Sequence, residues 1–286
     1  MSLTPAEVRR KRRAHRIWSG VKTGVLYLLM CLVALVTLGP FLYLTLTSLH
    51  TGKAVFQMPP PIFPLTLKNY EAVFTLLPVG RYLWNTIRIV AMGVGLNVAV
   101  CALAAYPLAK LRFRGRDLIF YAIVSTMLLP NAAGTIVNFL TLKKLHLTNT
   151  LLGVVLPSAA NVFNIFLMRQ AYLTVPRELD EAARIDGANE WWIFWRVNLP
   201  LVKPALATVV IFDFMAFWNS FLWPVIVLRD PDLYPLATGL RYLQGQFSYN
   251  FAYIAAGTVV SILPMILVFL ILQKQFIQGV VGALKG

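Results

Sequence analysis

The sequence predicts an all-α membrane protein with six transmembrane helices and a long cytoplasmic loop between the fourth and the fifth of them. Two observations lead to this fold class. The 286 residues are 58% hydrophobic and only 13% charged, with a mean hydropathy of +0.69, which is typical of membrane proteins. The hydrophobic residues also gather in six stretches, each long enough to cross a hydrocarbon core, which takes about 20 helical residues.

Charged residues are absent from all of these stretches but one, which carries Asp213. We expect the six helices over Thr23–Gly52, Ile89–Ala109, Leu118–Leu142, Leu147–Met168, Pro204–Leu228 and Tyr242–Gln273. The stretches are too long and too evenly apolar for the alternating segments of about ten residues that build membrane barrels. The first stretch follows a basic start like that of a signal peptide, but its apolar run is far longer than a signal core, so we expect an uncleaved span.

The basic residues predict the orientation of the chain. The net charge is +15, and most Lys and Arg residues lie on one side of the membrane if the amino terminus is cytoplasmic. On that side lie Arg9, Arg10, Lys11, Arg12, Arg13, Arg16, Lys22, Lys110, Arg112, Arg114, Arg116, Arg169, Arg177, Arg184, Arg196, Lys203, Lys274 and Lys285. On the other lie Lys53, Lys68, Arg81, Lys143, Lys144, Arg229 and Arg241. The positive-inside rule therefore places both termini and the long loop in the cytoplasm, and no nucleic acid is needed to explain the charge.

The outer segment between the first two spans contains two local signals. Prolines between Met58 and Pro64 favour an extended, non-helical crossing. Residues 67–77 then predict a short amphipathic helix at the outer interface, with four residues near one face: Leu67, Tyr70, Phe74 and Leu77.

Small residues and prolines indicate how the next spans pack. Ala102, Ala104 and Ala105 at the inner end of the second span permit close helix packing. Pro130 and Pro157 should each bend or break a helix, which a membrane tolerates only where protein or water satisfies the freed carbonyl groups. These two prolines either line the pore or kink packed helices.

A charged, partly amphipathic island of residues 175–204 separates the fourth and fifth spans. Pro176 suits the first position of a helix, because a proton on its nitrogen would have no partner there. The positive end of the helix dipole favours the acidic residues of the first turns, Glu178, Asp180 and Glu181. One face that another surface can approach would be formed by Leu179, Ala182, Ala183 and Asp186. Gly187 ends this helix, because glycine adopts the left-handed conformation at little cost.

A second, aromatic-rich helix should follow in the same island. Asn189 can cap it, and its aromatic residues are Trp191, Trp192, Phe194 and Trp195. It must end before Pro200, because proline disfavours a helical conformation in the residue that precedes it. The island is thus a helix, a sharp turn and a second helix, and its two adjacent tryptophans either anchor it at the membrane interface or dock a partner.

The motif Glu181-Ala182-Ala183, Gly187 and Val197-Asn198-Leu199-Pro200 resembles the EAA loop of ABC importer permeases, in which isoleucine usually stands in place of Val197. The longer strings EAARIDGA and FWRVNLPLVKPA resemble the maltose-type, carbohydrate-importing branch. In that family the loop is a coupling element that sits in a cleft of the ATPase subunit. The resemblance implies that residues 176–198 and the two that follow couple this chain to an ATPase through Glu181, Ala182, Ala183, Arg184, Gly187, Phe194, Leu199 and Pro200.

The resemblance also implies separate roles within the loop. Glu181 and Arg184 would make polar contacts with the ATPase, Phe194 would fill an apolar pocket of it, and Gly187 would permit the turn. Shorter matches at residues 67–70, 84–86 and 273–286 extend the resemblance over the chain from about residue 23 onward. The domains would be a basic cytoplasmic tail of residues 1–22 and a permease domain of residues 23–286, with 175–204 as the coupling loop.

The fifth span contains the candidate residues for a substrate path. Burying a carboxylate in the hydrocarbon layer costs free energy, so Asp213 should face protein or water. The family has a Trp-Asn pair similar to Trp218-Asn219. The hypothesis is that Asp213, Trp218 and Asn219 lie on the translocation path. Carboxylate and amide groups there could accept hydrogen bonds from sugar hydroxyl groups. The alternative is an internal pair of Asp213, with Arg88 as one candidate, or hydrogen bonds to neighbouring helices.

Sequence signals of catalysis are missing. No G-x-x-x-x-G-K-[ST] string is present, so partner subunits would use the ATP, and no cofactor is expected in this chain. Histidines and cysteines do not have the spacing of metal ligands, and no G-x-S-x-G motif occurs. Cys31 and Cys101 both fall inside spans, so apolar packing is expected rather than a disulfide. We therefore do not expect an enzyme.

The resemblance implies a permease subunit of an ABC importer for a sugar, oligosaccharide or related carbohydrate in a bacterial inner membrane. Its partners would be a paralogous second permease, two ABC ATPase subunits and an extracytoplasmic solute-binding protein. ATP binding would move the coupling helices and switch the spans from inward-open to outward-open. The alternatives are an ABC permease for a non-sugar solute, or a secondary transporter driven by an ion gradient, for which only Asp213 offers an ionisable group at mid-membrane.

Overall fold

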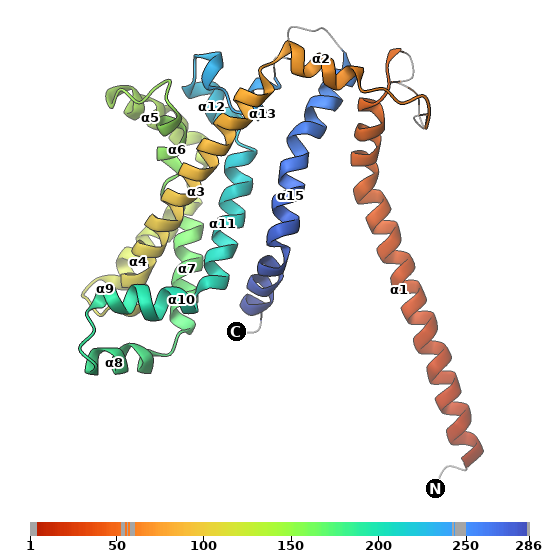
Figure 1. Ribbon diagram of the computed structural model, residues 1–286. Helices are drawn as coiled ribbons and strands as arrows, with labels where there is room; N and C mark the ends of the chain where they lie inside the picture. Colours follow the sequence, from red (N-terminus) through yellow and green to blue (C-terminus); the bar gives the residue numbers. More distant parts are fainter. Residues whose placement is uncertain are drawn as a thin grey trace. The chain divides into compact units, whose positions relative to one another are not determined.

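The computed structural model describes residues 5–52, 55, 57, 61–241, 243 and 250–284. Over these residues the chain is mostly helical and contains no strand (Figure 1), which confirms the all-α class. Three helices are long and apolar enough to cross a membrane by themselves, and three bent helix pairs raise the number of candidate spans to six if each pair counts as one. The structure therefore supports between three and six spans.

The helices follow one another in short connections. In chain order they are α1 (Pro5–Ser48), α2 (Lys68–Leu76), α3 (Val79–Lys110), α4 (Arg116–Ser125), η2 (Thr126–Leu128), α5 (Asn131–Lys144), α6 (Leu151–Val155), η3 (Leu156–Ser158), α7 (Val162–Thr174), α8 (Arg177–Ile185), α9 (Glu190–Trp192), the π-helical turn η4 (Ile193–Asn198), α10 (Leu199–Leu201), α11 (Lys203–Trp218), α12 (Leu222–Val227), η5 (Pro231–Leu233), α13 (Leu236–Gly239) and α15 (Phe251–Leu284).

The chain divides into two compact units, and Met1–Glu71 with Phe251–Val259 forms the first. Helix α1 runs unbroken past residue 22, and most side chains of its apolar part, Lys22–Ser48, are exposed, as expected for a helix surrounded by lipid, except near its end, where Thr47 and Ser48 are buried. Its carboxyl end is tied to the start of α2, because the Asn69 amide donates hydrogen bonds of 2.7 Å to the carbonyl oxygens of both Ser48 and His50. The short helix expected over residues 67–77 is present as α2, whereas Met58–Pro60 lie outside the described residues.

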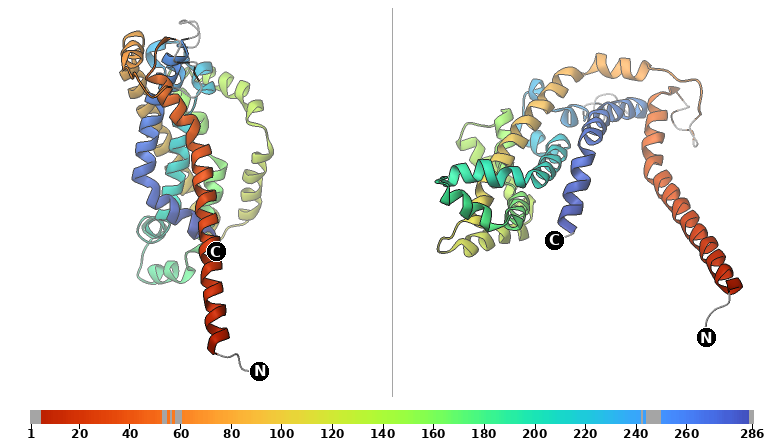
Figure 2. Two further views of the ribbon diagram at one scale, coloured as in Figure 1. Left: turned by 90° about the vertical axis from the view of Figure 1, so that its right-hand side faces the viewer. Right: turned by 60° about the horizontal axis from the view of Figure 1, so that its bottom comes forward.

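The second unit, Ala72–Asn250 with Val260–Gly286, is organised around α3. Helix α3 packs against α6, α7 and α11, which lie beside it in Figure 1 and in both views of Figure 2. Small residues permit this approach, as predicted for Ala102 and Ala105, which are buried. At Gly93 a Cβ atom would lie 2.5 Å from the ring of Phe217, so only glycine fits between α3 and α11 there.

Both prolines that were expected to break a helix do so. Pro130 precedes α5 and marks a bend of 107° between the segments Arg116–Leu128 and Ala133–Lys144. Pro157 lies in η3 at a bend of 51° between Leu151–Ser158 and Val162–Thr174. Each break leaves nearby backbone carbonyl groups without helical partners.

The helices differ in their bounds from the expected spans, and two cases show why. Helix α3 begins at Val79 rather than at Ile89, because the helix extends beyond the apolar stretch through a polar turn that contains Asn85 and Arg88. The fifth stretch was expected to be one helix over Pro204–Leu228, but α11 ends at Trp218 and α12 begins only at Leu222. Hydropathy identifies the part of a helix that can lie in the membrane, but it does not fix the residues at which the helix begins and ends.

The outer end of α3 is anchored to the loop that leads into α13. The Asn85 amide donates to the carbonyl oxygens of Asp232 (2.7 Å) and Tyr234 (3.1 Å), and the Thr86 hydroxyl accepts from the backbone N–H of Leu236 at 2.8 Å. Gly239 packs directly on the ring of Tyr82, where a Cβ atom would come within 2.2 Å. These contacts satisfy polar groups of an irregular loop that would otherwise be buried without partners.

Candidate functional site

The segment between α7 and α11 folds as a helix, a sharp turn and a second helix, as the sequence predicts (Figure 1). Helix α8 begins at Arg177, one residue later than expected, with Pro176 immediately before it. Gly187 ends it with φ +84°, the left-handed conformation for which glycine was expected. Asn189 caps the next helix, because its side-chain oxygen accepts a hydrogen bond of 2.8 Å from the backbone N–H of Trp192. We call residues 175–204 the coupling segment, after the role that the sequence resemblance implies for them.

The expectation that the second helix ends before Pro200 is wrong. The helix runs on from Glu190 to Leu201, and Pro200 lies inside α10. The turn before it, Ile193–Asn198, is π-helical. A π turn is wider than an α turn, so the carbonyl group that a proline ring would strike in a regular helix is displaced. A sequence rule for α-helices therefore misplaced the end of a helix that changes its pitch.

A buried ion pair fastens the coupling segment to α3. Lys110 Nζ lies 2.9 Å from Asp180 Oδ2, and the two side chains are only 2% and 4% exposed. Lys110 Nζ also donates to the Val175 carbonyl oxygen at 2.7 Å, and Asp180 Oδ1 accepts from the Asn198 amide at 2.6 Å. Each charge thus has hydrogen bonds besides its partner, which a buried pair requires. The result joins the end of α3, the helix α8 and the π turn in one polar cluster.

A second polar contact lies at the other end of α8. The Tyr106 hydroxyl of α3 donates to Glu190 Oε2 at 2.9 Å, and Arg184 donates to Glu190 Oε1 through Nε (2.9 Å) and Nη2 (2.8 Å). The hydrogen bond to Glu190 raises the pKa of Arg184 above its ordinary value, so this guanidinium stays charged. Arg184, predicted to contact an ATPase, is thus already engaged within the chain.

Phe194 is placed differently from its predicted role. The interpretation from sequence puts it in an apolar pocket of another subunit, but it is only 3% exposed. Its ring makes edge-to-face contacts with Tyr106 (5.2 Å between centroids), Trp195 (5.1 Å) and Trp191 (6.2 Å), and it lies 6.5 Å from Tyr172. Phe194 therefore packs the π turn onto α3 and α7, and its contact surface is used up inside this chain.

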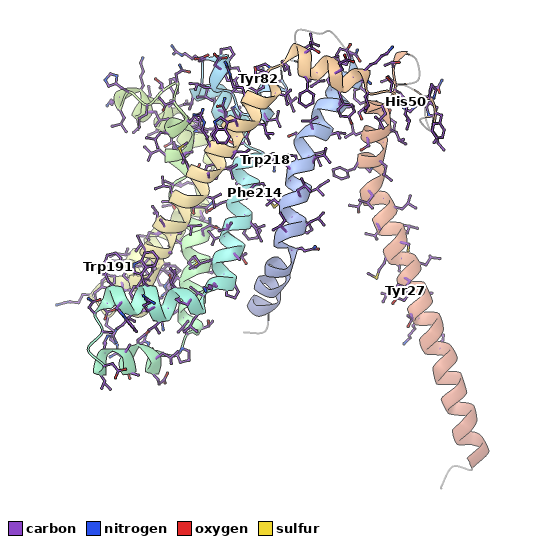
Figure 3. All side chains as sticks on the ribbon, viewed as in Figure 1. Tyr27, His50, Tyr82, Trp191, Phe214 and Trp218 are labelled. Carbon is purple, nitrogen blue, oxygen red and sulfur yellow. The ribbon has the colours of Figure 1, made fainter. Side chains whose placement is uncertain are left out.

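The exposed surface of the coupling segment combines apolar and aromatic side chains with charged ones. Ile185 is 87% exposed although α8 is otherwise polar, and Leu179 is exposed on the same helix. The second helix exposes Trp191, which Figure 3 labels, together with Trp192 and Trp195. Glu181, Ala182 and Gly187 are exposed as well, and so is Pro200, with Leu199 half-buried. Ala183 differs, because it turns inward beside Asp180, so the expected stripe of Leu179, Ala182, Ala183 and Asp186 is not one surface.

Several residues of this site escaped sequence reasoning. Lys110 was interpreted as one of many basic residues at the cytoplasmic border, and its position in the sequence gave no sign of a contact with Asp180. Asn198 was noticed only as part of the motif, not as a partner of Asp180. Ile185 could have been found, because an isoleucine in a helix with this many charged residues suggests a contact surface.

The three residues predicted for a substrate path have unequal surroundings. Asp213 is 2% exposed and accepts a hydrogen bond of 2.8 Å from the Asn164 amide of α7, which also donates to Asn97 Oδ1 of α3 at 3.1 Å. Arg88, the suggested ion-pair partner, instead donates to Asn85 Oδ1 at 2.7 Å. Of the alternatives for Asp213, the structure thus contains the hydrogen bonds to neighbouring helices.

Trp218 and Asn219 differ from each other as well. Trp218 is buried against Phe214, with ring centroids 5.4 Å apart, and its Nε1 donates to the Ser261 carbonyl oxygen at 3.1 Å; Figure 3 labels both aromatic residues. Asn219 is exposed and donates to the Met215 carbonyl oxygen at 2.8 Å. Of the three, Asn219 has a side chain that a solute could reach.

Comparison with known proteins agrees with this architecture. Residues 97–281 match the family described as "Binding-protein-dependent transport system inner membrane component". The chain is 31% identical over 261 residues to the lactose transport system permease protein LacG of Rhizobium radiobacter, covering 91% of this chain and 96% of that protein. It is 36% identical over 226 residues to the arabinooligosaccharides transport system permease protein AraQ of Halalkalibacterium halodurans, covering 78% and 80%.

A solved structure gives the same result for the fold. A chain from the crystal structure of a bacterial ABC transporter involved in the import of the acidic polysaccharide alginate superimposes with a TM-score of 0.79 at 32% identity, over 92% of this chain and 98% of that one. The matching family contains transport permeases and is not an enzyme family. The family match covers well over half of the sequence, and the chain therefore belongs to the binding-protein-dependent transport system inner membrane components, the permeases of ABC importers.

Proposed function

We propose that this chain is one of two permease subunits of an ATP-driven importer for a carbohydrate, and that it forms half of the translocation path. The observation that carries the proposal is the alginate importer's permease, which matches almost the whole chain at 32% identity. The printed functions of the relatives, transport of lactose and of arabinooligosaccharides, support an oligosaccharide as the solute. The partners would be a paralogous permease, two ABC ATPases and a solute-binding protein outside the membrane.

The proposed topology has six spans, of which the third and fourth are bent pairs. The fifth would be formed by α11 and α12, and the Glu190–Leu201 helix before it would belong to the cytoplasmic loop. The excess of Lys and Arg on one side supports cytoplasmic termini and a cytoplasmic coupling segment between the fourth and fifth spans. The domains would be the basic tail of residues 1–22, of which residues 5–22 belong to α1, and the permease domain of residues 23–286. The chain would lie in a bacterial inner membrane.

The arrangement of the coupling segment supports a division of roles. The exposed Glu181, Ala182 and Ile185 would contact a cleft of the ATPase, while Gly187 sets the angle between the two helices. The buried Asp180 and Phe194 would hold this surface rigidly against α3 and α7. When nucleotide closes the ATPase pair, the moving cleft would carry the segment and the attached helices from the inward-open to the outward-open state.

An association experiment tests the proposal. The native chain should co-purify in mild detergent with its ATPase, and Glu181→Lys together with Ile185→Asp should reduce this association by at least about tenfold, because both residues are exposed on α8 and both are proposed to contact the ATPase. The matched control is Leu145→Asp, an apolar-to-acidic change at another exposed residue, in the turn after α5, which should leave association unchanged.

The outcome also distinguishes the proposed function from its alternatives. If no ATPase accompanies the native chain, an ion-driven carrier becomes the function to examine. If the double variant binds the ATPase as well as the native chain does, the coupling segment is not the docking element. A third result, import of a peptide or amino acid by the assembled complex, would retain the permease and change the solute class.

Asp213→Asn provides a separate prediction about the substrate path. The asparagine keeps the shape of Asp213 and an oxygen that can accept from Asn164, so the contact between α7 and α11 should survive. We expect the KM of uptake and the range of sugars transported to stay within about twofold of the native values, because the side chain is buried within this chain and is hydrogen-bonded to Asn164. A changed sugar preference in competition assays would instead place Asp213 on the path.

A further inference from the structure

A pocket of about 650 Å³ lies where the turn from α3 to α4 meets the start of α8. Its lining combines four arginines with apolar side chains, and the residues that matter are Arg112, Arg114, Arg116, Arg177, Phe113 and Leu118. Three of the arginines come from the turn and the first residue of α4, and Arg177 is the first residue of α8, so the pocket borders directly on the coupling segment.

Most of the positive charge in this pocket has no counterion. Asp117 also lines the pocket, where Arg116 contacts it through Nε (3.1 Å) and Nη2 (3.2 Å), and it accepts from Arg169 Nη2 at 3.3 Å. One carboxylate is thus shared by two guanidinium groups. Arg112, Arg114 and Arg177 make no hydrogen bond or ion pair with any residue that the structure describes. Three unpaired guanidinium groups around one cavity favour an anion with several oxygen acceptors.

The apolar part of the pocket continues along α4. Leu118 is 75% exposed, and Ile119 and Tyr121 are exposed beyond it, so an apolar surface leads away from the arginines along the helix. The backbone N–H groups of the first turn of α4 open toward the same end without a side-chain cap. An anionic group at the arginines with a hydrocarbon chain along α4 would satisfy both halves of this surface.

We propose that this pocket binds the phosphate group of an anionic phospholipid. The arginines would hold the phosphate oxygens, and the acyl chains would lie on the exposed face of α4. This site goes beyond the proposed function. The proposed topology would place it at the cytoplasmic leaflet, and only that placement rests on the proposed function. Because Arg177 belongs to α8, a bound lipid would link the α3–α4 turn to the coupling segment and help to set the position of that segment relative to the membrane.

Lipid binding to the purified full chain, with any subunits that accompany it, tests the site. Native mass spectrometry with dioleoylphosphatidylglycerol and dioleoylphosphatidylcholine at equal concentrations should show a preferred first phosphatidylglycerol. Arg112→Gln with Arg114→Gln should weaken that binding by about 30-fold, the combined effect of two arginines near a membrane surface. The control, Lys143→Gln with Lys144→Gln, removes two charges at the end of α5 and should retain the native preference.

Three outcomes would overturn the proposal: equal binding of both lipids, equal loss in both double variants, or tight binding of glycerol phosphate without acyl chains. A fourth would do so as well: normal lipid binding combined with loss of the ATPase from the arginine variant, because the arginines would then dock a protein. Arg177→Gln, an exposed change on another helix, gives an independent test, with about fivefold weaker binding expected. Failure to find any ATPase would count against the proposed function and leave the lipid result standing.

Discussion

Asp180→Leu is expected to leave little folded protein in the membrane, because it strands the Lys110 ammonium group in a buried site. Removing one member of a buried, hydrogen-bonded ion pair typically costs about 3–5 kcal/mol, a large part of the roughly 5–15 kcal/mol that stabilises a domain. The carbonyl oxygen of Val175 alone cannot compensate a full charge. The measurement is the yield of monodisperse protein in size-exclusion chromatography and its midpoint of thermal unfolding.

The double variant Lys110→Met with Asp180→Leu separates charge from packing. Well-packed apolar residues often replace a buried pair without loss of stability, so most of the native yield should return. Arg116→Met serves as the control, since its ion pair with Asp117 is partly exposed and should contribute less than about 1 kcal/mol. A single Asp180→Leu variant as stable as the native chain would show that Lys110 and Asp180 do not fasten the coupling segment.

Phe194→Ala should have the next largest effect, a loss of about 3–5 kcal/mol. The truncated side chain would leave a cavity between the π turn and the rings of Tyr106 and Tyr172, and edge-to-face contacts would be lost with it. Phe194→Leu keeps most of the volume and should recover much of this loss. The stability of both variants is measured by thermal unfolding, with protease cleavage within the coupling segment as the readout.

An exposed aromatic residue of the same helix provides the comparison. Trp192→Ala should change stability by less than about 1 kcal/mol, because half of that side chain already faces solvent, yet it removes surface from the proposed ATPase contact. The opposite pattern would restore the role first suggested by the motif: if Phe194→Ala is as stable as the native chain and no longer binds the ATPase, then Phe194 docks directly.

The sequence predicted best what depends on local rules. Long apolar stretches located the candidate spans, since lipid requires helices whose side chains are apolar. Gly187 and Asn189 were assigned to a turn and a cap because a positive φ and a free carbonyl acceptor are properties of single residues. Pro130 and Pro157 broke helices for the same local reason.

What the sequence did not predict depends on contacts between distant segments. Phe194 and Trp195 are adjacent aromatic residues, and only the position of α3 and α7 decides that Phe194 is buried and Trp195 exposed. The partnership of Lys110 with Asp180 joins two helices that no spacing rule connects. Pro200 remained inside a helix because the π turn before it altered the geometry that the rule assumes.

The bend at Pro130 has a consequence for how the chain enters the membrane during synthesis. At about 1.5 Å per residue, the arms Arg116–Leu128 and Ala133–Lys144 each rise only about 20 Å, less than the roughly 30 Å of a hydrocarbon layer. Neither arm can leave the translocon alone as a stable helix, and the unpaired carbonyl groups at the break need protein around them. In the proposed six-span topology, integration of this bent pair would depend on helices that are made later, so its insertion would be cooperative with theirs.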